Sequence, residues 1–306
     1  MTPELSLCIV NHRTPGLLAD CLRSIADTRA GWPIEILIVN NTPDDAEQVR
    51  ALAARYGPAQ VIQNLTPLGY AANQNQLFRR ATGRYWLALN SDTRVQPGAL
   101  QALSAFMDLH PRAALAGPRL VRADGRLQPS ARDFPTPLTH FLEASGLWQL
   151  LRGRRSIGAV YALCSPHTEV RRVDWLTGAC LIVRPAAVAE AGGFDEALFP
   201  EMYGEDLEWA WRLRAAGWEV WFDPHAVVTH LESQSPLEAR SLAMYRGFYR
   251  FCAAHYPPGR QAAIRAATAA ALWPRRWLAR DRQAQAAYAA LIQLPMPSAA
   301  DLRRPA

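Results

Sequence analysis

The stretch Tyr85–Asp92, with the sequence YWLALNSD, decides the fold class. Its first five residues are apolar or aromatic without interruption, and its last three, Asn90, Ser91 and Asp92, are polar. A short apolar run bounded by polar residues is typical of a strand that is buried on both faces of a sheet. Pro97 follows a few residues later and favours the start of a helix. The stretch therefore predicts a buried strand followed by a helix, the repeating unit of an α/β fold.

Two earlier stretches repeat this pattern of a buried strand with a polar end. Leu5–Val10 is followed by Asn11, and Glu35–Val39 is followed by Asn40 and Asn41. Apolar residues at helical spacing separate the predicted strands, over residues 15–25, 45–56 and 69–81. This alternation predicts a mostly parallel, Rossmann-like sheet flanked by helices. Because the carboxyl ends of parallel strands meet at one edge, we expect the polar residues to form a ligand site there.

The composition excludes several classes of protein. The chain has 306 residues, of which 50% are hydrophobic and 20% charged, so it can bury a sizeable core and is not a disordered chain. No charge-free apolar stretch approaches the roughly 20 residues that a transmembrane helix needs. The glycine-rich fingerprint of dinucleotide-binding folds is absent after the first predicted strand, and no P-loop motif occurs anywhere.

The N-terminus and the cysteines indicate where the protein resides. The first residues lack the basic start and the long apolar run of a signal peptide. The five cysteines are scattered, odd in number and without a C-x-x-C pair. This usage is typical of a reducing compartment and argues against a disulfide or zinc framework. We therefore expect a cytoplasmic protein.

The charge is distributed unevenly and suggests two parts, a main domain over residues 1–239 and a helical C-terminal extension over residues 240–306. The main domain has 22 arginines and 25 carboxylates, whereas the extension has 11 arginines and only two carboxylates; lysine is absent throughout. Residues 120–172 of the main domain are rich in proline and arginine, and Ala123–Gly125 is a predicted hairpin turn. We expect this segment to be a variable insertion or a flexible flap.

The extension is predicted to form three helices, separated by Pro257–Pro258 and by Pro274. It combines its arginines with many Trp, Tyr and Phe residues. One interpretation is peripheral contact with an anionic membrane surface. The other is that the aromatic side chains pack on the main domain and the arginines remain in solvent. We expect no nucleic-acid binding, because no motif of that class is present.

Five carboxylates lie between residues 194 and 206, around the start of a predicted helix. Glu205 and Asp206 begin that helix, where acidic side chains interact favourably with the helix dipole. A carboxylate among like charges also gains the raised pKa that a general base needs. Both interpretations remain open from these residues alone.

Two further residues are candidates for metal binding. Asp92 ends a strand at the predicted ligand edge, where Mg²⁺ or Mn²⁺ takes one or two carboxylates together with substrate phosphates. His230 ends another predicted strand, Val227–His230, and could be a further ligand. The alternatives are an aspartate that caps a turn and a histidine that is packed or hydrogen-bonded.

Together these stretches resemble glycosyltransferase family 2, in particular its bacterial rhamnosyltransferase-like members. The resemblance covers most of residues 4–235 in the expected order. It rests on the stretches Leu5–Thr14 (LSLCIVNHRT), Glu35–Thr42 (EILIVNNT), Gly69–Asn75 (GYAANQN), Ala81–Leu100 (ATGRYWLALNSDTRVQPGAL), Trp175–Arg184 (WLTGACLIVR), Gly192–Arg214 (GGFDEALFPEMYGEDLEWAWRLR) and Pro224–Ser235. It implies the A-type glycosyltransferase fold, a nucleotide-diphospho-sugar donor, a divalent metal (Mg²⁺ or Mn²⁺) and inverting sugar transfer.

The resemblance also implies roles for single residues. Asp206, in the Glu205–Asp206 pair, corresponds to the catalytic base, and Asp92 to the metal-binding carboxylate. Asn90 stands where the family often has the first Asp of its D-x-D-type motif. Asn40 replaces a common Asp that contacts the nucleotide base, which leaves the base preference open. The donor-binding residues implied are Val10, Asn11, Asn40, Asn41, Gly69, Asn75, Asn90 and Ser91, and those on the acceptor side are Trp175, Gly178 and Ala179.

The function expected from this resemblance is transfer of a sugar, rhamnose from dTDP-rhamnose above all, to a hydroxyl of a glycan or lipid-linked acceptor in cell-surface polysaccharide synthesis. In such a reaction Asp206 would take the proton of the attacking hydroxyl, and a cation at Asp92 would offset the charge of the leaving nucleoside diphosphate. The alternative is a non-catalytic module that binds a sugar nucleotide or a glycan on the same scaffold.

Overall fold

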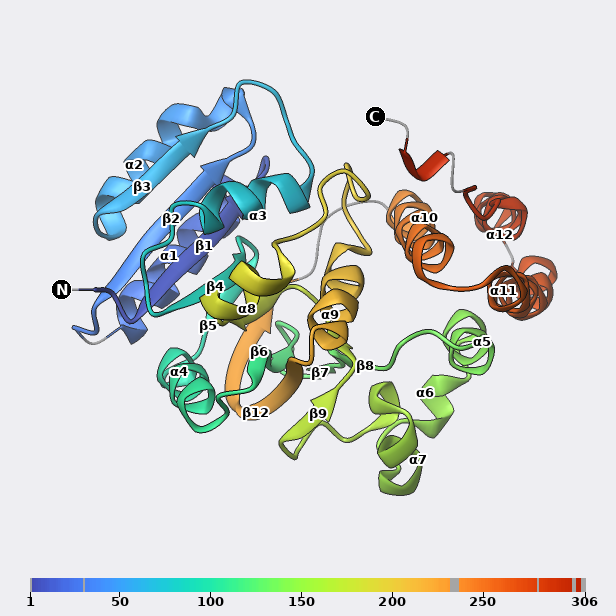
Figure 1. Ribbon diagram of the computed structural model, residues 1–306. Helices are drawn as coiled ribbons and strands as arrows, with labels where there is room; N and C mark the ends of the chain where they lie inside the picture. Colours follow the sequence, from blue (N-terminus) through green and yellow to red (C-terminus); the bar gives the residue numbers. More distant parts are fainter. Residues whose placement is uncertain (1, 30, 232–236, 280, 299–300, 304–306) are drawn as a thin grey trace.

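The computed structural model describes residues 2–29, 31–231, 237–279, 281–298 and 301–303, and a ten-stranded mixed sheet lies at the centre of this part of the chain (Figure 1). In spatial order its strands are β3 (Ala59–Gln63), β2 (Ile34–Asn40), β1 (Leu5–Asn11), β4 (Tyr85–Asn90), β11 (Cys180–Val183), β6 (Ala113–Val121), β12 (Glu219–His230) and β5 (Thr93–Val95). β7 (Leu127–Gln128) pairs with β6, and β9 (Arg171–Val173) pairs with β12. A separate two-stranded ribbon consists of β8 (Ala131–Arg132) and β10 (Trp175–Leu176).

The direction of the strands brings the polar strand ends to one edge. β1 runs parallel to both neighbours, so that Asn11 lies opposite Asn40 and Val10 lies opposite Asn90. β11 is antiparallel to β4 and to β6, and β12 is parallel to β6. β12 therefore points the same way as β1 and β4, which places His230 at the same edge. The predicted sheet, mostly parallel in its main strands, is confirmed, with β11 and the short edge strands running antiparallel.

Helices cover both faces of the sheet and enclose two apolar cores. One core packs α1 (Pro15–Thr28), α2 (Ala46–Tyr56) and α4 (Ala99–Leu109) on the sheet, and the other packs α3 (Tyr70–Phe78), α8 (Pro185–Ala191) and α9 (Glu205–Ala215). The amphipathic spacing read from the sequence explains this arrangement. In α1 the buried side chains are Leu18, Cys21, Leu22 and Ile25, which share one face of the helix.

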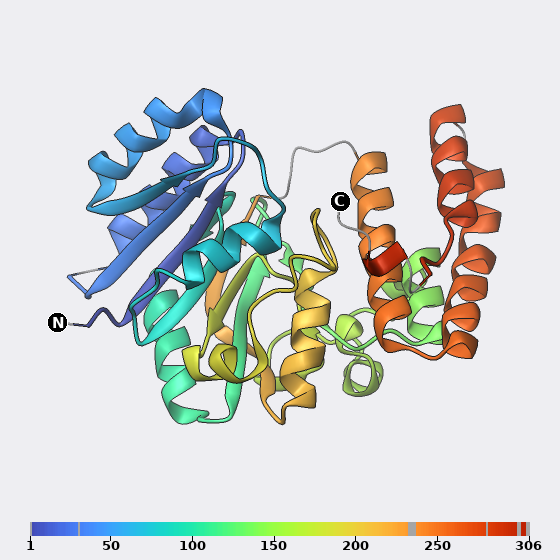
Figure 2. The same cartoon turned by 45° about the horizontal axis from the view of Figure 1, so that its top comes forward.

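The remaining helices form a separate group beside α9, away from β1–β3 (Figures 1 and 2). They are α5 (Pro137–Ser145), α6 (Trp148–Leu151), α7 (Arg155–Val160), α10 (Leu237–His255), α11 (Pro258–Leu278) and α12 (Arg282–Gln293). Three 3-10 turns complete the described elements, at Pro43–Asp45, Ala162–Cys164 and Asp301–Arg303.

Residues 120–172, expected to be a variable insertion or a flexible flap, have ordered elements of their own. Thr136 and Thr139 form a reciprocal capping box at the start of α5. Ala144 of α5 packs with Ala271 and Leu272 of α11. Pro137 occupies the first turn of α5, where its missing N–H is harmless. The segment is thus ordered rather than a flexible flap, and its being a variable insertion stays a prediction.

Pro274 does not end a helix, contrary to the prediction. α11 continues through it to Leu278, and the chain turns only at Ala279. A proline inside a helix costs about 3 kcal/mol. The buried face of α11, which includes Ile264 and Leu272, packs against neighbouring helices and offsets this cost.

The predicted strand Val227–His230 is only the last part of a longer one. It belongs to β12, which starts at Glu219, and a shift in the pairing of β12 with β6 between Asp223 and Val227 accommodates Pro224. The stretch Trp175–Arg184 of the resemblance contains two strands, β10 and β11. The predicted turn at Ala123–Gly125 is confirmed and joins β6 to β7.

The C-terminal extension packs on the main domain through its first helix. Tyr249, Phe251 and Tyr256 are buried with Phe199 and Leu207 in a third apolar cluster. The packing interpretation of the aromatic residues is thus correct for α10. No helix within the described ranges is long and apolar enough to cross a membrane. Residues 232–235 of the last matched stretch lie outside the described part of the chain, and the division at residue 239 stays a prediction.

Candidate active site

The polar strand ends meet in one hydrogen-bonded cluster at the carboxyl edge of the sheet. Asn11 Nδ2 donates to Asn40 Oδ1 at 2.8 Å and to Asp45 Oδ2 at 3.1 Å. Both ends of the Asn41 carboxamide bond to Leu68, whose N–H donates at 2.8 Å and whose carbonyl accepts at 2.9 Å. The sequence therefore located this cluster correctly, although the partners of the amides could not be read from it.

Burial shows that these amides support the loops at the edge. Asn11 and Asn40 are fully buried, and Asn41 is 4% exposed. Asp45, which the sequence analysis missed, belongs to the same cluster. Its Oδ1 is buried and has no hydrogen-bond partner within the described part of the chain. The only signal for Asp45 was its place at the start of a helix, which is common for aspartate and carries little information.

The other residues expected near the donor lie around this cluster. The Ser91 hydroxyl is 3.1 Å from that of Thr14. Val10 is half-buried beside Asn90 in the sheet. Gly69 directly precedes α3 and lies close to the backbone of Pro200. A Cβ at residue 69 would lie 2.8 Å from the carbonyl carbon of Pro200. Gly69 therefore allows a close backbone contact, and its contact with a donor stays a prediction.

Asp92 and His230, which lie far apart in the sequence, are adjacent in the structure. The distance from His230 Nε2 to Asp92 Oδ1 is 3.3 Å. His230 Nδ1 is 3.0 Å from Gln128 Oε1, and the tautomer that carries its N–H on Nδ1 presents the lone pair of Nε2 to the carboxylate. Two acceptors that face each other in this way suit a bound cation.

The chemistry of this pair fits a Mg²⁺ or Mn²⁺ ion that is held partly by its substrate. Across the described residues, no group of three or more His, Cys, Asp or Glu side chains forms a cation site. Mg²⁺ is commonly held by one or two carboxylates, substrate phosphates and water. Asp92 and His230 can therefore supply part of a coordination shell that a diphosphate completes.

The acidic pair at the start of α9 follows a turn with unusual backbone angles. Tyr203 and Gly204 have φ values of 83° and 96°, in the left-handed region that only glycine adopts readily. A Cβ on Gly204 would lie 2.8 Å from the carbonyl carbon of Gly247 in α10. The close contact with the C-terminal extension thus helps to hold the strained turn that presents Glu205 and Asp206.

The two carboxylates have different surroundings. Glu205 is 5% exposed, and its Oε2 has no hydrogen-bond partner among the described residues. Asp206 is half-buried; its Oδ2 accepts from the Gly178 N–H at 3.0 Å and its Oδ1 from the Leu207 N–H at 2.8 Å. Burial raises the pKa of both carboxyls, and the charge of Asp206 raises that of Glu205 further. The two N–H groups and Arg132 partly counteract the rise in the pKa of Asp206.

The hydroxyl of Tyr70 links the acidic pair to Asp92. It donates to the Gly178 carbonyl at 3.2 Å. Burial raises its pKa, and the negative charges of Glu205, Asp206 and Asp92 all add to that rise. The sequence did not reveal this link, because Tyr70 has no motif of its own.

The residues expected on the acceptor side lie next to Asp206. Ala179 is hydrogen-bonded to the end of β4, where its carbonyl accepts from the Asn90 N–H at 3.0 Å. Trp175 Nε1 donates to the Asp133 carbonyl at 3.0 Å. The Arg132 guanidinium lies 5.5 Å from the centre of the Trp175 ring. β8, from the segment once expected to be a flap, thus contributes a charged residue to this side of the site.

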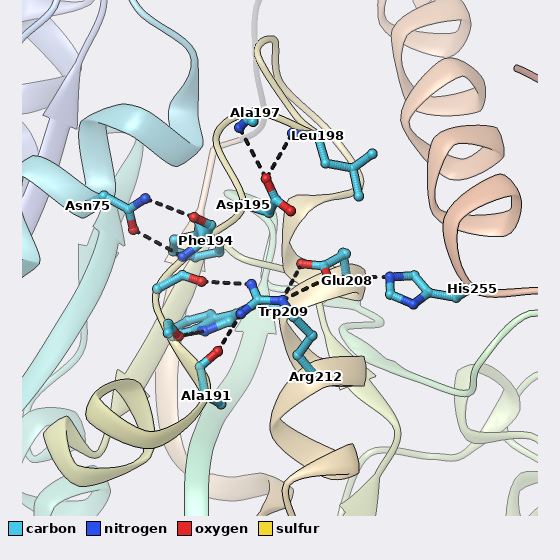
Figure 3. A network of polar contacts seen from close by, with 12 residues as sticks. Asn75, Ala191, Phe194, Asp195, Ala197, Leu198, Glu208, Trp209, Arg212 and His255 are labelled. Carbon is cyan, nitrogen blue, oxygen red and sulfur yellow. Dashed lines mark hydrogen bonds and ion pairs between the residues drawn. The ribbon is translucent and has the colours of Figure 1, made fainter. Parts of the chain in front are cut away.

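A polar network anchors the loop between α8 and α9 (Figure 3). Asn75 Nδ2 donates to the Phe194 carbonyl at 2.8 Å, and the Phe194 N–H donates back to Asn75 Oδ1 at 3.0 Å. Arg212 bonds both oxygens of Glu208, and His255 of α10 approaches Glu208 at 3.3 Å. The Asn75 carboxamide is thus engaged with the loop, and its contact with the donor stays a prediction.

Comparison with solved structures defines the class. A structure of GalNAc-T7 with UDP, GalNAc and Mn²⁺ matches 99% of this chain and 53% of its own, with a TM-score of 0.61 and 15% identity. The mannosyltransferase PcManGT from Pyrobaculum calidifontis, in complex with GDP-Man and Mn²⁺, matches 98% of this chain and 78% of its own, with a TM-score of 0.58 and 16% identity. The protein therefore has the A-type glycosyltransferase fold.

Sequence comparison identifies the family. Residues 3–249 match the family described as glycosyltransferase like family 2, and the chain belongs to it. The N-acetylglucosaminyl-diphospho-decaprenol L-rhamnosyltransferase of Mycobacterium tuberculosis is 30% identical over 248 residues, which are 77% of this chain and 78% of that protein. The O-antigen biosynthesis protein RfbC of Myxococcus xanthus is 31% identical over 242 residues, 76% of this chain but 18% of that protein.

Proposed function

We propose that this glycosyltransferase moves a sugar from a nucleotide-diphospho-sugar to a hydroxyl of a glycan or lipid-linked acceptor, with inversion at the anomeric carbon. Rhamnose from dTDP-rhamnose is the proposed donor, supported by the 30% identical mycobacterial rhamnosyltransferase. The observation that carries the proposal is the environment of the half-buried Asp206. Its carboxylate lies beside the buried Glu205 and near Tyr70, and Asp92 also lies close to Tyr70.

Asp206 is the proposed general base. A sugar hydroxyl is a weak nucleophile, so a carboxylate that takes its proton during attack lowers the barrier. Its raised pKa brings Asp206 closer to the basicity that this step requires, while the Gly178 and Leu207 N–H groups hold it in one orientation. Glu205, whose pKa is also raised, keeps its proton more readily and thereby limits the negative charge beside the base.

Asp92 and His230 are the proposed protein ligands of the divalent metal. Bound there, Mg²⁺ or Mn²⁺ would offset the negative charge that develops on the leaving nucleoside diphosphate. Gln128 fixes the ring of His230 through its bond to Nδ1, and so determines which nitrogen faces Asp92.

The amide cluster is the proposed nucleotide side of the site. Asn11, Asn40 and Asn41 hold the two loops that follow β1 and β2, and Asp45 offers a buried oxygen without a partner among the described residues. A thymine or uracil base carries one ring N–H that such an oxygen can accept. Asp45 would thus supply the charge that is missing where Asn40 replaces the Asp common in this family.

The extension is the proposed membrane-contacting part of a protein that works at the cytoplasmic face of the membrane. Trp273 and Trp277 are 58% and 66% exposed, and their ring centres are 6.1 Å apart. The Arg276 guanidinium lies 5.7 Å from the centre of the Trp277 ring. Indole rings next to arginine suit the interface of an anionic membrane, where a lipid-linked acceptor would be found.

The test of the proposed function is Asp206→Asn, assayed with dTDP-, UDP- and GDP-sugars. We expect kcat to fall by about 10²–10⁴-fold, with donor binding measured by calorimetry little changed. Asp195→Asn is a matched control in the same acidic stretch, because its side chain only accepts from the N–H groups of Ala197 and Leu198. Turnover by Asp206→Asn near the wild-type rate would exclude it as the base.

Asp92→Ala tests the metal site separately. It should weaken Mn²⁺-dependent binding of the nucleoside diphosphate and leave metal-independent binding unchanged. An unaltered metal titration would contradict the assignment. Binding of a donor by the wild-type protein without turnover on any acceptor would instead favour the non-catalytic module.

A further inference from the structure

Arg119, near the end of β6, is a cation for which no function has been assigned. Its Nε is buried and has no hydrogen-bond partner among the described residues. It pairs in the sheet with Val227, three residues before His230. A strand rises about 3.3 Å per residue, so the backbone of Arg119 lies roughly 10 Å along the sheet from His230. An arginine side chain together with a bound diphosphate can span that distance.

The alternation of side chains shows which face of the sheet Arg119 occupies. Residues two apart on a strand share a face, so Arg119 lies on the same face as Gly117. A Cβ on Gly117 would lie 2.9 Å from Leu176, the neighbour of Trp175 in β10. Arg119 is therefore on the face of the sheet that carries α9 and the acceptor side of the site.

Ser130 and Arg132 approach the same region from β8 and the residue before it. The Ser130 side chain is 2% exposed, and its hydroxyl has no hydrogen-bond partner within the described part of the chain. Arg132 lies two residues further on the same side of the strand. One of its terminal nitrogens pairs with Glu143 at 2.7 Å, whereas its buried Nε has no partner among the described residues. The positive charge of Arg132 also acts to lower the pKa of Asp206.

The ribbon of β8 and β10 brings these residues together, because Leu176, which packs over Gly117, pairs with Ala131, to which the His167 ring is bonded. His167 Nε2 accepts the Ala131 N–H at 3.3 Å, between Ser130 and Arg132, and its Nδ1 lies 2.8 Å from the Ser165 carbonyl. Burial lowers the pKa of His167 to about 4, and the positive charges of Arg171, Arg132 and Arg119 contribute in the same direction. The ring is therefore neutral and bonded within the protein, which leaves the Nε groups of Arg119 and Arg132 and the Ser130 hydroxyl for a ligand.

We propose that Arg119, Ser130 and Arg132 form an anion subsite that binds a phosphate or diphosphate group between the metal pair and the acceptor side of the site. Unpaired donors in a buried position are costly unless a ligand satisfies them. Guanidinium groups match the oxygens of phosphate in charge and geometry, and a buried hydroxyl adds a neutral donor.

This proposal rests on the proposed function only for the source of the phosphate. The diphosphate could be that of the nucleotide donor, or that of an acceptor whose sugar is linked to a lipid through a diphosphate. Both present the same oxygens to the subsite. The experiment therefore first measures binding of inorganic pyrophosphate, which requires neither catalysis nor added metal, and then separates the two sources.

The test compares the wild-type protein with Arg119→Gln, Ser130→Ala and Arg132→Gln by calorimetry with pyrophosphate and no divalent metal. We expect Arg119→Gln to weaken binding about tenfold or more, which is typical of losing a charged hydrogen bond. Arg126→Gln is the matched control, since Arg126 lies close in the sequence, is 83% exposed and forms an ion pair with Asp124. Thermal unfolding of each variant establishes that it is folded, and Ser130→Ala provides a minimal change if Arg119→Gln is unstable.

Two further titrations identify the source. If the donor supplies the phosphate, Arg119→Gln weakens binding of dTDP but not of dTMP. If the acceptor supplies it, dTDP binding is unchanged and KM rises only for an acceptor that carries a diphosphate. Either result supports the subsite. Pyrophosphate affinity equal to that of the wild type in all three folded variants would overturn the subsite, even if transferase activity were found. Absence of any turnover by the wild type would instead refute the proposed function.

Discussion

The contact between α10 and the turn before Asp206 makes Gly247→Ala a sharp test of the role of the extension. In the structure, Gly247 lies against the backbone of Tyr203 and Gly204. A Cβ at residue 247 would fall on the Tyr203 carbonyl oxygen and lie only 2.6 Å from its carbonyl carbon. Both obstacles are backbone atoms, which cannot rotate away as a flexible side chain could.

The size of the effect follows from this geometry. Ordinary contact of a Cβ begins at 3.4 Å, so α10 and the turn must separate by about 1 Å. Forcing an extra methyl group into a packed contact costs about 1–3 kcal/mol. The turn leads directly into Glu205 and Asp206, and a displacement of about 1 Å in a catalytic site reduces rates by up to about 10²-fold.

Gly259→Ala in α11 is the matched control, because nothing lies within 4 Å of a Cβ at that position. Both substitutions replace a helical glycine by alanine, so the difference between the two variants isolates the steric cost. We expect Gly247→Ala to melt roughly 3–10 °C below Gly259→Ala by differential scanning fluorimetry. Its kcat should fall at least tenfold with less change in donor affinity. Equal melting temperatures and equal kcat in the two variants would refute the contact and its role in placing Asp206.

Three other predictions address charge and surface. The pKa of Glu205 is raised in the folded protein, so ionisation of its carboxyl lowers the stability as pH rises above 4.5, the ordinary pKa of glutamate. Glu205→Gln should remove this loss of stability at high pH. A stability profile from denaturation between pH 5 and 9 that is the same in the variant and the wild type would contradict the prediction. Glu208 behaves oppositely: burial raises its pKa, but His255 and Arg212 lower it overall, so its stabilisation is present above pH 4.5 and is lost on acidification. Glu208→Gln should therefore cost about 3 kcal/mol at pH 7 in chemical denaturation, and a neutral effect would show that Arg212 does not need its carboxylate. Trp273→Ala with Trp277→Ala should reduce cosedimentation with anionic vesicles while leaving the melting temperature unchanged; equal sedimentation of variant and wild type would exclude these rings from membrane contact.

The vesicle experiment uses point variants because the extension is part of the folded body. Removal of residues 240–306 would expose Phe199 and Leu207, which pack with Tyr249 and Phe251 of α10. A truncated chain would therefore bind lipid, or aggregate, for reasons unrelated to its native surface.

The parts of the site that the sequence predicted are those whose signal is local. Buried strands are short apolar runs, and a polar residue directly after each run is delivered to the sheet edge by the direction of the strand. Asn11, Asn40, Asn90 and Asp92 were found in this way. Glu205 and Asp206 were found because acidic residues concentrate at the start of a helix whose apolar spacing is visible in the sequence.

The residues that the sequence did not reveal act through long-range contacts. Tyr70 meets Gly178 across more than a hundred residues, and Gln128 meets His230 across a similar distance. Ser130 belongs to the segment 120–172, which Arg119 directly precedes, and the prolines and arginines of that segment gave no periodic signal. The continuation of α11 through Pro274 was missed for the same reason, since packing against other helices outweighs a local preference.

The sequence by itself determined the fold class and which polar and acidic residues lie at the carboxyl edge of the sheet and at the start of α9, because each depends on hydrophobic patterning and strand direction over a few neighbouring residues. Only the tertiary structure decided which acids share one site, which side chains support them and how the C-terminal extension is used. The composition of the extension indicated only that it is basic and aromatic. Its first helix instead packs against the turn that presents Asp206, because two glycines on segments distant in sequence allow their backbones to meet.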